Sequence, residues 1–113
     1  MSFHAGTIEK GTGRASKLGF PTINILLEDE SVSGIYAARV TVDGVSYNSA
    51  AYANRRRKLL EAHLLDFSGE LYGREANIEL LEKLRDDNVF DNDAALRAAI
   101  ENDIQKARGY FGK

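Results

Sequence analysis

The hydrophobic side chains of this chain change their spacing once, shortly after Leu81, and that change limits the fold more than any other feature. Up to that point they fall in short segments separated by glycine and polar turns, a pattern typical of β-strands. Beyond it, Leu96, Ile100 and Ile104 recur at the spacing of one helix face. Because short strands joined by tight turns favour a small closed barrel or a sandwich, we expect a mainly β fold followed by one α-helix.

Local turn and cap signals place the ends of these elements. Asp43-Gly44 stands between two strand-like segments and is a strong hairpin signal. Residues 91–93 offer N-cap oxygens for the helix, and Gly109 is expected to end it. The six expected strands span residues 7–9, 20–27, 34–42, 45–52, 59–67 and 75–81.

Composition excludes several classes of function. The chain has 113 residues, which favours one domain over residues 1–113, and its formal net charge of −2 argues against a basic nucleic-acid-binding surface. It has no cysteine, so disulfides, thiolate metal sites and cysteine nucleophiles are excluded. Its apolar runs are too short to span a bilayer, and its first residues carry no secretory signal pattern. We therefore expect a cytoplasmic protein with neither a nucleic-acid nor a membrane partner.

The segment after the first expected strand concentrates glycines and cations. Gly11, Gly13 and Gly19 allow the backbone to approach a ligand closely, because they carry no Cβ. Arg14 and Lys17 among them are suited to phosphate oxygens. The segment matches neither the dinucleotide fingerprint nor the Walker A motif. Taken alone, it favours a plain connecting loop slightly over a phosphate-binding loop.

Thr22 and Asn24 form a pair of oxygen donors on the expected second strand. Two residues apart on a strand, their side chains point to the same face. A hydroxyl and an amide oxygen are both hard donors that Mg²⁺ accepts. Polar residues on a solvated strand face are the commoner explanation of such a pair.

Glu61 and His63 share one face of the expected fifth strand, whose other face is apolar. A carboxylate in so apolar a strand is costly to bury unless it is paired or takes part in chemistry. Near an alcohol substrate Glu61 is suited to act as a general base in phosphoryl transfer. The alternative is an exposed half-strand on which Glu61 pairs with an arginine of residues 55–57. For His63 we expect a packing or hydrogen-bonding role.

Other charged and aromatic side chains each allow two interpretations. Residues 55–58, Arg-Arg-Arg-Lys, are expected to form a solvated turn, with phosphate steering into a nearby site as the less common role. Arg85 precedes two aspartates, so a surface salt bridge is its simplest role. Phe90 is one of several aromatics suited to stacking on a planar ligand, although such side chains more often belong to a core.

Taken together, these segments resemble the riboflavin kinase (flavokinase) family. The resemblance covers nearly the whole chain, with the motifs in the family's order. It rests on Gly11-Thr12-Gly13-Arg14, Lys17-Leu18-Gly19-Phe20-Pro21-Thr22-Ile23-Asn24, Ser33-Gly34-Ile35-Tyr36-Ala37, Glu61-Ala62-His63-Leu64-Leu65-Asp66-Phe67-Ser68-Gly69-Glu70-Leu71-Tyr72-Gly73 and residues 84–108.

The resemblance implies a six-stranded antiparallel Greek-key barrel with a C-terminal α-helix. It also implies transfer of the γ-phosphoryl group of ATP to the ribityl 5′-hydroxyl of riboflavin, giving FMN and ADP, by a monomer acting on small molecules. Glu61 would be the catalytic base, and Thr22 and Asn24 would hold Mg²⁺. Arg85 and Phe90 would lie at the flavin. The nucleotide-binding residues would be Gly11, Gly13, Arg14, Lys17, Gly19, Thr22 and Asn24.

The chain departs from the family pattern between its fourth and fifth expected strands. Residues 51–58 are shorter than the family's segment and lack its Asn-Ile-Gly order and its Pro-Thr pair, and Ala15 and Ser16 replace a typical Gly and Arg. A non-catalytic flavin- or nucleotide-binding module of the same fold is therefore the alternative function. A kinase for a more anionic acceptor is a third possibility. The adenylyltransferase domain often fused to bacterial members is not expected within 113 residues, so FMN is the expected end product.

Overall fold

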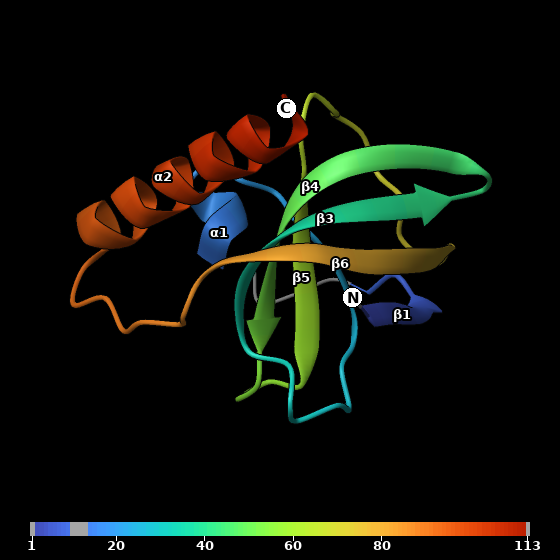
Figure 1. Ribbon diagram of the computed structural model, residues 1–113, viewed down its shortest axis with the longest axis horizontal. Helices are drawn as coiled ribbons and strands as arrows, with labels where there is room; N and C mark the ends of the chain where they lie inside the picture. The colour runs from blue at the N-terminus through green and yellow to red at the C-terminus, as the bar shows by residue number, and fades with distance from the viewer. Residues whose placement is uncertain (1, 10–13, 113) are drawn as a thin grey trace.

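The computed structural model describes residues 2–9 and 14–112, which form six strands, one short helix and one long helix (Figure 1). The predicted class, mainly β with antiparallel strands and a C-terminal helix, is confirmed. The elements are β1 (Ser2–Thr7), α1 (Arg14–Lys17), β2 (Ile23–Leu26), β3 (Gly34–Val42), β4 (Val45–Asn54), β5 (Leu59–Leu64), β6 (Glu75–Arg85) and α2 (Asp93–Phe111).

The strands form a Greek key that closes almost completely into a barrel. Their order in the sheet is β1-β6-β3-β4-β5-β2, and every neighbouring pair is antiparallel. Three successive strands, β3 to β5, are neighbours, and β6 returns to lie beside β3, which is the Greek-key arrangement. The two edges meet just beyond β1, where the backbone N–H of Glu9 donates to the carbonyl of Asn24 at 2.7 Å.

Strand alternation explains why one face of β5 is free for chemistry. Leu60 and Ala62 are fully buried in the barrel core, where they join Val40 and Ile78. Since successive side chains on a strand point to opposite faces, Glu61 must leave the core on the other side of the sheet.

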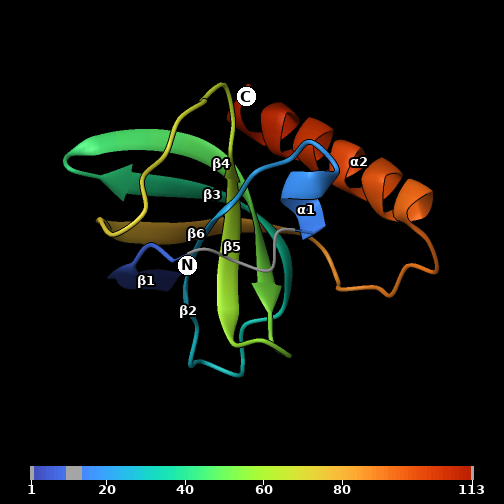
Figure 2. The ribbon, with the colours of Figure 1, turned by 180° about the vertical axis from the view of Figure 1, so that it is seen from behind.

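The long helix α2 lies across one end of the barrel, as both views show (Figures 1 and 2). It begins where the sequence predicted, because the Asn92 side chain accepts a hydrogen bond from the N–H of Ala95 at 2.8 Å. The expected end at Gly109 is wrong: the helix continues to Phe111, whose ring packs against the cluster around Ala107. One glycine inside a helix costs only about 1 kcal/mol, which this packing offsets. Neither helix in the described part of the chain is long and apolar enough to cross a membrane.

The observed strand boundaries differ from the expected ones where backbone pairing, and not the pattern of hydrophobic residues, determines where a strand begins or ends. β1 runs from Ser2 to Thr7, earlier than the expected residues 7–9, because backbone pairing with β6 needs no apolar run. β6 continues to Arg85, since its last residues still pair with β3. The short helix α1 lies in the segment expected to be a loop.

Gly34, the first residue of β3, is a position where glycine is required. Its φ is +94°, and a Cβ there would lie 2.5 Å from the backbone carbonyl oxygen of Arg85. We expect Gly34→Ala to lower the free energy of unfolding by about 3 kcal/mol, through backbone strain and overpacking together. Gly44 is the matched control, because its φ is +78° with nothing within 4 Å of its Cβ position. Denaturant titration of both variants should show the larger loss for Gly34→Ala; equal losses would mean that the contact is relieved cheaply.

Candidate functional site

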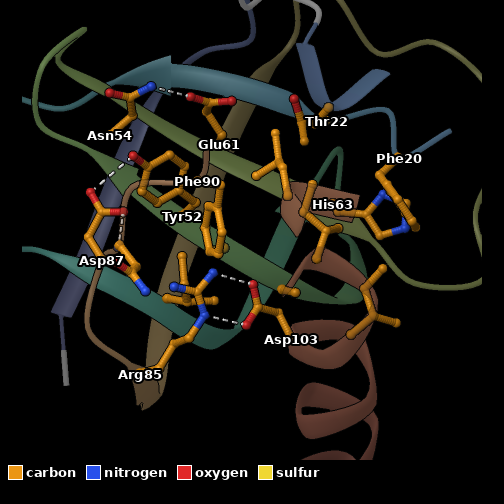
Figure 3. A pocket seen from close by; sticks show the side chains of 18 of the residues that line it. Phe20, Thr22, Tyr52, Asn54, Glu61, His63, Arg85, Asp87, Phe90 and Asp103 are labelled. Atoms are coloured by element: carbon orange, nitrogen blue, oxygen red, sulfur yellow. Dashed lines mark hydrogen bonds and ion pairs between the residues drawn. The ribbon is translucent and has the colours of Figure 1, made fainter. Parts of the chain in front are cut away.

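A cavity of about 670 Å³ lies between the open end of the barrel and α2 (Figure 3). One part of its wall is mainly polar, and the other is mainly apolar apart from the Arg85–Asp103 pair, so it suits a ligand with both a charged and a planar apolar portion. The polar part includes Lys17, Thr22, Asn54, Arg55, Arg56, Arg57, Glu61 and His63, and the apolar part includes Ile35, Ala50, Val89, Phe90, Leu96, Ile100 and Ile104.

Glu61 is the carboxylate at the polar part of this cavity. It is 9% exposed, and one of its two oxygens, Oε2, accepts a hydrogen bond from the Asn54 amide at 2.8 Å (Figure 3). Asn54 comes from β4, so this bond ties the carboxylate to the neighbouring strand. The alternative of a solvent-exposed Glu61 is therefore wrong.

Opposing influences act on the proton affinity of Glu61. Burial raises its pKa above the ordinary value, because the charged form loses hydration. The Asn54 hydrogen bond and the positive charge of Arg57 act in the opposite direction. A carboxylate with a raised pKa is a stronger base than an exposed one, which suits it to accept a proton from a hydroxyl.

Asn24 of β2 lies opposite Glu61, and Thr22 lies just before the start of β2. Asn24 is paired directly across from Glu61 in the β2–β5 register. Its amide nitrogen donates to the carbonyl of Glu9 at 3.2 Å, which leaves Oδ1 facing Thr22, whose hydroxyl donates to it at 3.2 Å. Thr22 lines the cavity, whereas Asn24 is 1% exposed behind it. Two adjacent hard oxygens fit the donor preference of Mg²⁺.

His63 has the hydrogen-bonding and packing role expected from the sequence. Its Nδ1 lies 2.8 Å from the carbonyl oxygen of Pro21, and its ring meets Phe20 edge-on with centroids 5.9 Å apart. These contacts hold the segment before β2 against β5, and so fix the position of Thr22.

Tyr52 and Asp87 are cavity residues that the sequence analysis did not select. The Tyr52 hydroxyl donates to Asp87 Oδ2 at 3.1 Å (Figure 3). Burial, aided by the nearby negative charge of Asp87, raises the pKa of Tyr52 to about 12, so this phenol stays protonated. Tyr52 is paired with Glu61 across the β4–β5 hairpin. The register of the β4–β5 hairpin, with Tyr52 opposite Glu61, is the sequence-distant signal that places Tyr52 and Asn54 at the site.

Arg85 and Asp103 form a bidentate ion pair in the cavity wall. The guanidinium donates to both carboxylate oxygens, at 2.7 and 2.9 Å, and Asp103 is 5% exposed on α2 (Figure 3). The expected surface salt bridge of Arg85 with an adjacent aspartate is therefore wrong, although Nη1 does donate to the backbone carbonyl of Asp86. The guanidinium carbon also lies 5.6 Å from the centre of the Phe90 ring, which lines the cavity.

The expected nucleotide-binding residues are distributed unevenly around the cavity. Lys17 of α1 lines it, but Gly19, with a φ of +96°, does not. Arg14 begins α1. Gly11 and Gly13 lie outside the described residues. The arginine turn, residues 55–57, is exposed as expected, yet it also lines the cavity.

A Greek-key barrel whose end carries a ligand-sized cavity under a C-terminal helix defines a small-molecule-binding class of fold. Residues 2–111 match the family model described as flavokinase, riboflavin kinase. The solved riboflavin kinase from Trypanosoma brucei is similar, with a TM-score of 0.70 and 26% identity over 98% of this chain and 77% of that chain. The chain belongs to the riboflavin kinase family.

Curated relatives extend well beyond the matched region. A bifunctional riboflavin kinase/FMN adenylyltransferase from Pseudomonas fluorescens is 36% identical over 113 residues, which is 92% of this chain and 36% of that protein. A trifunctional protein RibF/MnmA from Mycoplasmoides gallisepticum is 31% identical over 117 residues, covering 96% of this chain and 18% of that protein. The chain thus spans well under half the length of these relatives.

Proposed function

We propose that the protein transfers the γ-phosphoryl group of ATP to the ribityl 5′-hydroxyl of riboflavin, giving FMN and ADP. The observation that carries this proposal is the buried carboxylate of Glu61, held by Asn54 on the wall of a half-polar, half-apolar cavity. Membership of the riboflavin kinase family supports the same substrates.

Glu61 acts as the base in this proposal. Its carboxylate accepts the proton of the 5′-hydroxyl as the oxygen attacks the γ-phosphorus, and the bond from that phosphorus to the bridging oxygen breaks to release ADP. Because Asn54 occupies Oε2, the other oxygen is the one offered to the substrate. Phosphoryl transfer depends mainly on positioning and charge stabilisation, so a fixed base of this kind is what the chain must supply.

Mg²⁺, when held by Thr22 and Asn24, supplies positive charge next to the phosphates. The hydrogen bond from Asn24 to Glu9 supports this assignment, because it turns the amide oxygen toward the Thr22 hydroxyl. Lys17, together with Gly11, Gly13, Arg14 and Gly19, is assigned to the nucleotide. In this arrangement the phosphates of ATP bind along the edge of β2, next to Glu61.

The flavin occupies the apolar part of the cavity in this proposal. Phe90 is assigned to its ring system, and Arg85 keeps Phe90 in place through the contact between guanidinium and ring. The α2 side chains Leu96, Ile100 and Ile104 exclude water from the same region. We further propose that residues 1–113 act as one kinase unit, a cytoplasmic monomer whose partners are small molecules.

Chromatography with fluorescence detection tests the proposed function. Purified protein incubated with riboflavin, ATP and Mg²⁺ should form FMN, and omission of either ATP or Mg²⁺ should abolish it. If no FMN forms while riboflavin or ATP still raises the melting temperature, the protein is a binding module and the proposal fails.

The pH dependence of turnover should report the raised pKa of Glu61. The base must be ionised to accept a proton, so kcat/KM should fall as the pH decreases through that pKa. This acidic limb should lie above the pH expected for an exposed glutamate, because burial raises the pKa. Tyr52, with its pKa raised to about 12, should contribute nothing to the profile near neutrality. A flat profile down to the range of an exposed glutamate, in protein that circular dichroism shows to be folded, would contradict this role of Glu61.

A further inference from the structure

The arginines of the turn at residues 55–57 differ from most arginines elsewhere in the described chain. Arg39 pairs with Glu79, Arg108 with Asp66, and other arginines pair with aspartates at Asp43 and Asp103. The side chains at 55–57 form no ion pair or hydrogen bond with any described residue. The chain carries 17 acidic residues against 15 lysines and arginines, so acidic partners are plentiful. Three uncommitted guanidinium groups at a cavity point to an anionic ligand.

This turn has a defined backbone. The Asn54 side chain accepts a hydrogen bond from the N–H of Arg57 at 3.2 Å, and the carbonyl of Lys58 accepts one from the N–H of Leu27 at 2.8 Å. Lys58 has a positive φ of 55°, which reverses the chain into β5. The turn is therefore fixed to both β4 and the end of β2.

Asn54 also connects this turn to the proposed base. Its side-chain oxygen accepts a hydrogen bond from the backbone N–H of Arg57, while its side-chain nitrogen donates to Glu61 at 2.8 Å. The Arg57 side chain lines the same cavity as Glu61, and its positive charge favours the ionised form of that carboxylate. The guanidinium is thus placed at the end of the cavity where the attacking hydroxyl loses its proton.

Among the residues that line the cavity, lysines and arginines outnumber carboxylates. The carboxylate of Asp103 is matched by Arg85, and that of Asp87 accepts a hydrogen bond from Tyr52. Asp93 lies at the start of α2 and lines the cavity from the helix side. A transferring phosphoryl group, with charge spread over three oxygens, matches a planar guanidinium that can donate two hydrogen bonds at once.

We propose that Arg57 binds the phosphoryl group during its transfer, and that Arg55 and Arg56 attract the polyphosphate of the donor at the mouth of the cavity. This assignment rests on the proposed kinase function. The sequence of this turn departs from the family pattern. The proposed phosphate contact by Arg57 therefore belongs to this chain's own turn.

Steady-state kinetics of Arg57→Gln tests the assignment. We expect kcat/KM for ATP to fall by about 100-fold, as when one donor to a transition-state oxygen is removed, with the KM for riboflavin changed less than about twofold. The kcat/KM of Arg57→Lys for ATP should lie between those of the original protein and Arg57→Gln, because lysine keeps the charge but not the paired donors. Arg97→Gln is the matched control, since Arg97 is exposed on α2 and does not line the cavity. Equal kinetics for Arg57→Gln and Arg97→Gln would overturn the assignment.

Calorimetric titration with inorganic tripolyphosphate separates this assignment from the kinase function. Arg57→Gln should bind tripolyphosphate about tenfold more weakly than Arg97→Gln, whether or not riboflavin is phosphorylated. If the unaltered protein makes no FMN but the two variants show this difference in tripolyphosphate affinity, the phosphate site stands and the kinase proposal fails. If FMN is made and tripolyphosphate binds both variants equally, the kinase proposal stands and the role of Arg57 is wrong.

Discussion

Glu61→Gln should reduce the rate of FMN formation by about 10²- to 10⁴-fold, the usual contribution of a positioned general base. Glutamine keeps the size of the side chain but has no carboxylate to accept the hydroxyl proton. Its amide oxygen can still accept the hydrogen bond that the Asn54 side-chain nitrogen donates to Glu61. Riboflavin and ATP should therefore bind to the variant with affinities within about threefold of the original, as measured by calorimetry.

Glu82→Gln provides the matched control for this experiment. Glu82 is exposed on β6 and does not line the cavity, so the same chemical change there should leave turnover unaltered. The melting temperatures of both variants should stay close to that of the original protein. Retention of most turnover by Glu61→Gln would remove Glu61 from the role of base.

Arg85→Met should cause the largest loss of stability among single substitutions in the cavity wall. It leaves the carboxylate of Asp103, which is 5% exposed, without the guanidinium that holds both of its oxygens. Removing one partner of a buried pair costs about 3 kcal/mol or more, since the remaining charge stays desolvated. In a domain of this size the melting temperature should fall by more than about 10 °C, which calorimetry measures directly.

Two further variants show whether this loss arises from the buried charge. Arg85→Met combined with Asp103→Leu should recover much of the stability, because no charge is then left buried. Arg108→Met breaks an exposed pair with Asp66, so it should cost less than about 1 kcal/mol. If the double variant is no more stable than Arg85→Met alone, packing and not electrostatics accounts for the loss.

The sequence predicted the class of fold because the strands follow local rules. The Asp43-Gly44 turn joins β3 and β4 as expected, and Leu60 and Ala62 alternate with Glu61 as a half-buried strand requires. β1 escaped prediction because its six residues hold no apolar run and are strand only through pairing with β6. Local pattern carries no information on such a partner.

The site residues likewise divide into those that local pattern identifies and those that depend on partners distant in the sequence. Glu61, Thr22 and Asn24 were selected because period 2 fixes their faces, and the structure places Asn24 of β2 opposite Glu61 of β5, with Thr22 just before β2. Asn54 and Asp103 were missed because their significance depends on partners 7 and 18 residues away in the chain. The expectation of a surface salt bridge between Arg85 and an adjacent aspartate was wrong for this reason, because its actual partner, Asp103 on α2, is 18 residues away in the chain.

Transfer of label from [γ-³²P]ATP tests the central claim most directly. The protein, incubated with labelled ATP, Mg²⁺ and riboflavin, should place the label in FMN, in a molar amount equal to the ADP formed. Label that appears only as inorganic phosphate, or that remains entirely in ATP while riboflavin is bound, would contradict phosphoryl transfer to the ribityl hydroxyl.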